Sequence, residues 1–73
     1  MPSLDDYTAV IAATGHHLAW TDDGEQRRFA LWLGDVLLMI APVNVAGTRP
    51  AADQPVDRED SFALDHLLRE ARG

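Results

Sequence analysis

Residues 18–42 set the fold, and they read LAWTDDGEQRRFALWLGDVLLMIAP. The pairs Asp23-Gly24 and Gly34-Asp35 interrupt this apolar stretch. Pairs of this kind between apolar runs are strong signals for tight β-hairpin turns. We therefore expect a three-stranded antiparallel meander with strands over residues 17–21, 26–33 and 36–42.

Two-residue turns at both places would fix the pairing of the strands. They put Leu18 opposite Phe29 across the first hairpin, and Leu31 opposite Leu38 across the second. Successive side chains of a strand point to opposite faces, so both registers gather one apolar set on the same face. We expect this face to form the core, with the residues Leu18, Phe29, Leu31, Leu33, Val36, Leu38 and Ile40.

The opposite face of this sheet is also apolar, although the second face of a half-buried antiparallel sheet is usually polar. It would carry Ala19, Arg28, Ala30, Trp32, Leu37, Met39 and Ala41. Residues 36–41 would also form an edge strand with no charge and no proline, so this edge lacks the usual protection against pairing. Trp, Met and Arg are enriched at protein interfaces. We expect a protein partner to contact Arg28, Trp32, Leu37, Met39 and, from the last helix, Phe62.

One helix is expected before the meander in the sequence and another after it. Ser3 and Asp6 make an approximate capping box for a helix over residues 3–14, and Gly15 follows it at a C′ position. A second helix over residues 57–72 has an apolar stripe, from which Phe62 points away; the stripe consists of Leu64, Leu67, Leu68 and Ala71. Residues 43–56, rich in Pro, Gly and Ala, are expected to form a loop.

The expected fold class is therefore α+β, in the order α-β-β-β-α, as a single small domain with both helices on the Leu31 face. One helix on each face would instead turn the outer residues into ordinary core. Another alternative is a three-helix all-α protein with one long helix over residues 23–41. Gly34 inside such a helix would cost about 1 kcal/mol relative to Ala. That helix would also lack a polar face.

Composition bounds the function. The chain has 73 residues, no cysteine and a net charge of −6, and its six basic residues are all arginines. A domain of this size buries only about 60% of its unfolded surface, so association with a partner or a second copy is a favoured way to complete the core. The negative charge disfavours nucleic acid and anionic membranes as partners. No stretch reaches the roughly 20 apolar residues of a membrane helix, and we expect a cytoplasmic protein.

The element order resembles that of double-stranded RNA-binding domains in topology alone. Those domains carry a basic cluster at the start of the last helix, where this chain has Asp57-Arg58-Glu59-Asp60. We therefore do not expect RNA binding from this resemblance.

Motifs for catalysis or metal binding are scarce. His16 and His17 are adjacent and would point to opposite faces of a strand, so one metal ion could not easily hold both, even with His66 as a third ligand. Ser3 and Ser61 lie near helix starts, where capping explains them. We therefore expect no enzyme activity, no metal site and no cofactor.

The sequence favours a small acidic, non-catalytic protein-interaction module of the adaptor, chaperone or inhibitor type, homodimeric through the apolar sheet face or the edge strand. One alternative is an acidic mimic of nucleic acid that inhibits a DNA- or RNA-binding protein. It requires one continuous surface of carboxylates from Asp22, Asp23, Glu25, Asp57, Glu59 and Asp60. A second alternative is a small metal-dependent enzyme.

Overall fold

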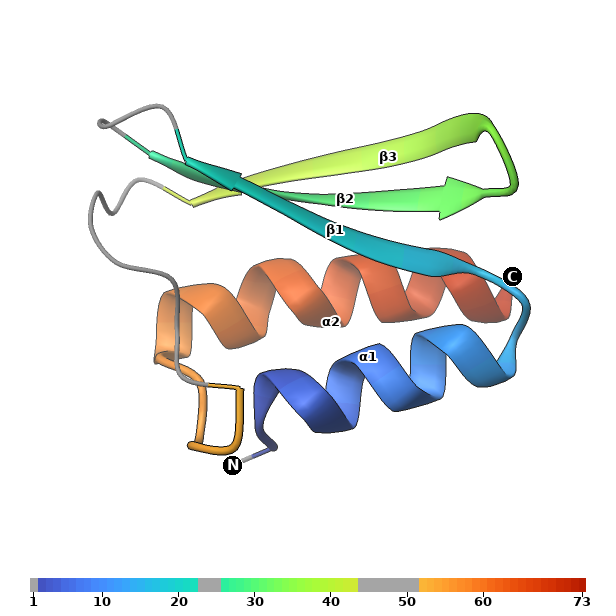
Figure 1. Ribbon diagram of the computed structural model, residues 1–73. Helices are drawn as coiled ribbons and strands as arrows, with labels where there is room; N and C mark the ends of the chain where they lie inside the picture. The colour runs from blue at the N-terminus through green and yellow to red at the C-terminus, as the bar shows by residue number, and fades with distance from the viewer. Residues whose placement is uncertain (1, 23–25, 44–51) are drawn as a thin grey trace.

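The computed structural model describes residues 2–22, 26–43 and 52–73. The elements are α1 (Leu4–Ala13), β1 (His17–Asp22), β2 (Arg27–Leu33), β3 (Val36–Val43) and α2 (Arg58–Arg72). The strands form one antiparallel sheet in the order β1-β2-β3, and both helices lie against the same face of it (Figure 1). The predicted α+β order is confirmed. The long helix over residues 23–41 and the arrangement with one helix on each face are both wrong.

The caps of α1 follow from its sequence. The Ser3 hydroxyl accepts a hydrogen bond from the Asp6 amide at 3.2 Å, and the Asp6 carboxylate accepts one from the Ser3 amide at 2.9 Å. This reciprocal pair is the predicted capping box. After the helix, Gly15 has a φ of 81°, a left-handed conformation that glycine adopts without steric cost.

Helix α2 begins after Asp57, one residue later than predicted, and ends at Arg72. Its buried side recurs at spacings of three and four residues, which is the period of one helix face. Asp60, Leu64, Leu67 and Ala71 lie on that side. Glu59 and Asp60 in the first turn, and Arg69 and Arg72 in the last, suit the helix dipole.

The first hairpin has the predicted faces with a different register. Asp22 pairs with Arg27 and Leu18 with Leu31, so the predicted pairing of Leu18 with Phe29 is wrong by two residues. The predicted turn at Asp23-Gly24 lies outside the described residues, and four residues separate the paired Asp22 and Arg27. A shift of two preserves side-chain orientation, which is why the predicted face of β1 survives.

The second hairpin turns at Gly34, whose φ is 60°, and pairs Leu33 with Val36 as predicted. Beyond this turn the pairing of β2 with β3 shifts by one residue. Trp32 pairs with Leu37, but Leu31 pairs with Met39, which leaves Leu38 as the extra residue of a β-bulge.

The bulge exchanges the two faces of the rest of β3. Met39, Ala41 and Val43 now share the face of Leu31 and Phe29 and pack toward the helices. Ile40 lies on the outer face and is 50% exposed. The predictions that Met39 lies on the outer face and that Leu38 and Ile40 belong to the core are therefore wrong. Leu33 and Val36, also predicted in the core, are exposed at the end of the sheet next to the turn.

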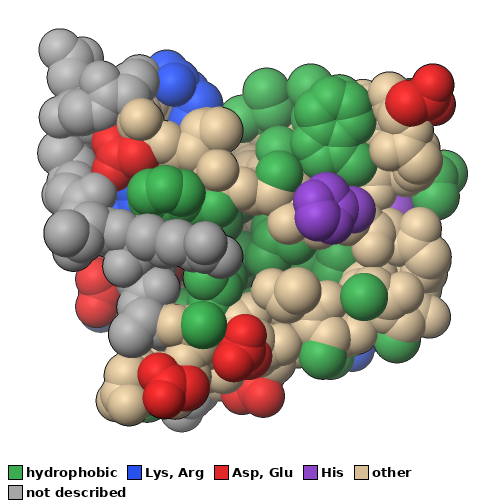
Figure 2. Space-filling model, in the orientation of Figure 1, with side chains coloured by type: hydrophobic (Ala, Val, Ile, Leu, Met, Phe, Trp, Pro, Cys, Tyr) green, Lys and Arg blue, Asp and Glu red, His purple; other side chains and the backbone are tan. Residues whose placement is uncertain are grey.

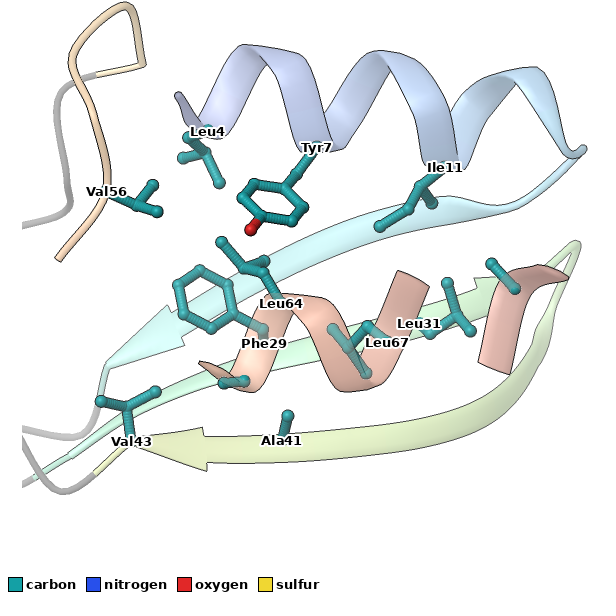
Figure 3. Close-up of a cluster of buried hydrophobic side chains, with 12 residues drawn as sticks. Leu4, Tyr7, Ile11, Phe29, Leu31, Ala41, Val43, Val56, Leu64 and Leu67 are labelled. Atoms are coloured by element: carbon teal, nitrogen blue, oxygen red, sulfur yellow. The ribbon is translucent and has the colours of Figure 1, made fainter. Parts of the chain in front are cut away.

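One core joins the two layers (Figure 3). The helices contribute Leu4, Tyr7, Ile11, Ala63, Leu64, Leu67 and Ala71, and the strands contribute Phe29, Leu31, Ala41 and Val43. Leu18, Trp20, Met39 and Leu68 pack against this cluster and are partly buried. On α1 the buried side chains are Leu4, Tyr7 and Ile11, whereas Val10 and Thr14 are exposed.

Val56 extends the core from the segment before α2, which is bonded to the start of the chain. The Val56 amide donates to the Pro2 carbonyl at 3.1 Å, and the Asp5 amide donates to the Ala52 carbonyl at 2.9 Å. We call residues 2–5 and 52–56 the clasp. Among the described residues, no helix has the length and apolar character that crossing a membrane requires.

Candidate protein interaction surface

The sheet has an outer face that neither helix covers. The face turned away from the helices carries His17, Ala19 and Thr21 from β1, Arg28, Ala30 and Trp32 from β2, and Leu37, Ile40 and Pro42 from β3. The two helices lie on the other side of the sheet, and hydrophobic side chains gather over the strands at the top of Figure 2. Arg28 and Trp32 are half-buried, and Leu37 is exposed. Three of the predicted partner-binding residues therefore lie on this outer face.

Within the part of the chain that the structure describes, strand β3 forms one edge of the sheet, because the strand order β1-β2-β3 places it beside β2 alone. It carries no charged residue between Val36 and Val43. Pro42 lies within the strand, so only residues 36–41 of this edge are free of proline. Val36, Leu37, Leu38 and Ile40 along this strand are all exposed large hydrophobics. An uncharged, exposed edge of this kind favours pairing with another chain.

A groove of about 810 Å³ lies between β3 and α2. The strand lines it with residues 39–43 and the helix with residues between Arg58 and His66. Its volume is within the range of roughly 300–1,000 Å³ that ligand pockets span. Met39, predicted on the outer face, is instead one of the side chains at this groove.

Phe62 stands beside the groove with 66% of its surface exposed. Its ring meets the His66 ring edge-to-face, with centroids 4.9 Å apart and planes at 74°. The predicted orientation of Phe62 away from the apolar stripe of α2 is confirmed by this exposure. A large aromatic ring left in water at a groove is typical of an interface anchor.

A buried ion pair, which the sequence analysis did not identify, joins β2 to α2. Arg27 Nη1 donates to Asp60 Oδ2 at 2.6 Å, and Asp60 is only 1% exposed. Arg27 Nη2 also lies 4.0 Å from a carboxylate oxygen of Asp57, whose side chain is 70% exposed. Burial raises the pKa of Asp60, and the Arg27 guanidinium opposes that rise. The spacing of these residues could have indicated their burial. Arg27 lies on the same face of its strand as Phe29, and Asp60 lies on the same face of its helix as Leu64.

A second buried polar group joins the two helices. The Tyr7 hydroxyl donates to Asp65 Oδ1 at 2.8 Å and lies 3.1 Å from Ser61 Oγ. Because the phenol has a single proton, which goes to the carboxylate, Ser61 is the donor to Tyr7. Burial raises the pKa of Tyr7, and the hydrogen bond and charge of Asp65 raise it further. Ser61 thus supports the packing of α1 against α2 as well as lying near a helix start.

The predicted acidic residues do not all share one exposed surface. Asp57 and Glu59 are exposed at the start of α2, Asp22 is half-buried at the end of β1, and Asp60 is buried against Arg27. The other two, Asp23 and Glu25, lie outside the described residues. The buried Asp60 therefore interrupts the continuous carboxylate surface that a nucleic-acid mimic requires.

The histidines are dispersed. His16 lies just after α1, where its Nδ1 is 2.9 Å from the Thr14 carbonyl oxygen. His17 is in β1 and His66 is in α2. Within residues 2–22, 26–43 and 52–73, no group of three histidine or carboxylate side chains is arranged to hold a metal ion.

Comparisons of the chain with protein-family models, with curated proteins and with solved structures each found no match. The candidate surface is therefore defined by geometry alone. It consists of the outer face of the sheet, the β3 edge, and the groove between β3 and α2.

Proposed function

We propose that this protein is a small, non-catalytic protein-interaction module that forms homodimers along the β3 side of its sheet. The observation that carries this proposal is the one-sided placement of the helices. Because α1 and α2 pack on the same face, the outer face and the β3 edge are left with exposed Leu37 and Ile40.

The energetics support association. Apolar surface removed from water contributes roughly 25 cal/mol per Å², so leaving several large side chains exposed forgoes a few kcal/mol in a chain of this size. Small domains commonly recover such a deficit by oligomerisation. The absence of charge along β3 also matters, because each copy carries a net charge of −6 and closely spaced carboxylates would repel.

The oligomeric state tests the proposal directly. We expect the wild-type protein to sediment as a dimer, and Leu37→Asp to sediment as a folded monomer, because a carboxylate in an apolar interface is left without a partner. Ala9→Asp is the matched control, since Ala9 is exposed on α1, which packs on the other face of the sheet. That variant should remain dimeric.

Circular dichroism confirms that each variant is folded before its mass is measured. A wild-type protein that stays monomeric at millimolar concentration would rule out the homodimer. A dimer that Leu37→Asp leaves as intact as Ala9→Asp does would place the contact away from the β3 side.

A further inference from the structure

The outer face of the sheet is ordered in three rows, because the strand pairing aligns its residues across the sheet. The rows are His17, Trp32 and Leu37, then Ala19, Ala30 and Ile40, then Thr21, Arg28 and Pro42. We call the second of these the middle row and the other two the end rows. Two alanines in the middle row leave little side chain there, so another surface can approach the sheet closely.

The outer face carries no carboxylate, although the chain has twelve acidic residues and only six basic ones. Among the strand residues that the structure describes, none that faces outward is Asp or Glu, and Arg28 is the only arginine there. Two copies, each with a net charge of −6, can therefore bring these faces together without placing carboxylates against each other. The charge pattern permits the face to meet its own copy.

Two orientations are open to such a pair. Sheets that pack face to face in the aligned manner keep their strands within about 30° of each other, so a two-fold axis between two copies runs either along the strands or across them. An axis along β2 would place Arg28 against the partner's Arg28, and like charges at an interface are unfavourable. An axis across the strands at the middle row exchanges the end rows, so that each Arg28 faces the partner's Trp32.

This exchange gives the end rows complementary contacts. The guanidinium of Arg28 would stack on the indole of the partner's Trp32, and Trp is the best ring for such a cation–π contact. The symmetry produces this contact twice. On β3, the exposed Leu37 would meet the partner's Pro42. The residues of the middle row would each meet their own copy across the axis.

The area of the face sets the strength of the contact. Three strands about 4.8 Å apart, the longest of them eight residues long, give a face of roughly a few hundred Å². That lies below the about 800 Å² that a standard interface buries on each partner, and it suits a weak, specific contact. We therefore expect a dissociation constant in the micromolar range, which changes measurably when a single contact is altered.

We propose that the outer face binds a second copy of the chain, with the two sheets packed face to face and antiparallel about a two-fold axis that crosses the strands at the middle row. This inference rests on the self-association proposed above. It names the face, the axis and the residue pairs that make the dimer.

A charge at the middle row tests which surface makes the contact. Ala19 lies on β1, the strand farthest from the β3 edge, so a dimer paired along that edge leaves it untouched. In the face-to-face dimer, Ala19→Glu places two carboxylates against each other and should raise the dissociation constant about 100-fold or more. Ala9→Glu is the matched control, because it makes the same change at an exposed position of α1 and should stay within about threefold of wild type.

The pair of Arg28 with the partner's Trp32 tests the orientation. Arg28→Ala removes two symmetry-related contacts and should raise the dissociation constant roughly tenfold. Trp32→Leu removes the ring and keeps an apolar side chain. In that background, Arg28→Ala should change the dissociation constant by less than about threefold, because its partner is already gone. Within one chain the two residues are about 13 Å apart along β2, so this coupling reports the contact between copies.

Sedimentation velocity over a dilution series measures wild type and all variants, after circular dichroism has shown that each is folded. If Ala19→Glu does not fold, Ala19→Gln replaces it and should weaken the dimer by a smaller factor. Arg28→Gln replaces Arg28→Ala on the same terms.

The outcomes separate this inference from the proposed function. A wild-type dimer that Leu37→Asp breaks and Ala19→Glu leaves intact places the contact at the β3 edge; it overturns the face-to-face pair while the proposed function stands. A dimer that Arg28→Ala tightens, or in which Arg28→Ala and Trp32→Leu act independently, overturns the antiparallel orientation. A monomeric wild type overturns both the inference and the function.

Discussion

At the scale of single residues, the polar groups inside this small core have the most specific roles. Tyr7, Ser61 and Asp65 tie α1 to α2, and Arg27 with Asp60 ties β2 to α2. Each group stands where two elements meet. Buried polar groups of this kind are costly unless they are hydrogen-bonded, so they favour one packing of the helices on the sheet.

The titration of Tyr7 tests the first group, and it gives a clean signal because Tyr7 is the only tyrosine in the chain. We expect the pKa of Tyr7 in the folded protein to lie above its ordinary value of 10.0, mainly because of burial. The folded state then holds the phenol proton more tightly than the unfolded state. Stability is therefore unaffected well below pH 10 and falls as the pH rises through the folded pKa.

The ultraviolet absorbance of the phenolate measures this titration. Asp65→Asn should lower the pKa of Tyr7 without returning it to 10.0, because the burial remains when the charge is removed. The same titration in concentrated urea should give a pKa of about 10. A folded protein whose Tyr7 titrates at 10 or below would contradict the buried position.

The pair of Arg27 and Asp60 makes a second prediction. Asp60→Asn leaves the Arg27 guanidinium buried without an ionic partner at short range, so we expect a loss of about 3 kcal/mol in the free energy of unfolding. Asp57→Asn is the control, because its exposed carboxylate at 4.0 Å from Arg27 should contribute less than about 1 kcal/mol. Urea denaturation at neutral pH measures both.

The double variant Arg27→Met/Asp60→Leu removes both charges, and so tests how far the cost of burying them offsets their attraction. Burial raises the pKa of Asp60, which means that the folded protein holds the carboxylate in its charged form at a cost. Replacing both partners with apolar side chains should therefore recover most of the stability that Asp60→Asn loses. A double variant no more stable than Asp60→Asn would contradict this account of the pair.

At the scale of elements, local chemistry predicted the helices and the second turn well. Ser3 with Asp6 gave the start of α1, and Gly34-Asp35 gave the turn between β2 and β3, because caps and tight turns depend on a few adjacent residues. The pairing of the first hairpin was wrong by two residues. Asp22-Asp23-Gly24-Glu25 offers more than one place to turn, and only the packing of Trp20 opposite Phe29 selects among them.

The bulge could not be predicted from alternation. Residues 36–41 are apolar without interruption, so the sequence carries no period that distinguishes Met39 from Ile40. The face of β3 is chosen by α2, which packs beneath it with the small Ala41 in the core. Met39 was therefore assigned to the wrong face. Trp32 and Leu37, which pair between the turn and the bulge, were assigned correctly.

Deleting the bulge residue tests this description. Without Leu38, the pairs of Trp32 with Leu37 and of Leu31 with Met39 become successive rungs of a regular ladder. No core side chain changes face, so we expect the deletion to alter the free energy of unfolding by less than about 1 kcal/mol. Deleting Ala30 from the central strand is the control. It turns one half of β2 over and should cost about 3 kcal/mol or more.

Chemical denaturation of both deletions measures the difference. Equal losses for the two would show that Leu38 is not a surplus residue in the ladder.

At the scale of the whole molecule, the arrangement is a sheet with both helices on one side. This layering was predicted from the order of elements, and it leaves an apolar outer face and an apolar edge. The monomerisation expected for Leu37→Asp belongs to this scale, because it depends on no pocket or motif. It depends on which side of the sheet the helices occupy.

The position of Phe62 and the pair of Arg27 with Asp60 could not be predicted from the sequence. Phe62 was recognised as misplaced for a core residue, but its place beside β3 required the packing of α2 against that strand. Asp60 was grouped with exposed carboxylates because its neighbours are acidic. Its burial depends on Arg27, thirty-three positions earlier in the chain.

The clasp between residues 2–5 and 52–56 has a consequence for the order in which the chain folds. Its hydrogen bonds join groups roughly fifty positions apart, and the entropy lost in closing a loop grows with its length. The two hairpins close much shorter loops and can form within microseconds. The sheet is therefore expected to assemble first, with its future core face open to water until the clasp brings α1 and α2 together beneath it.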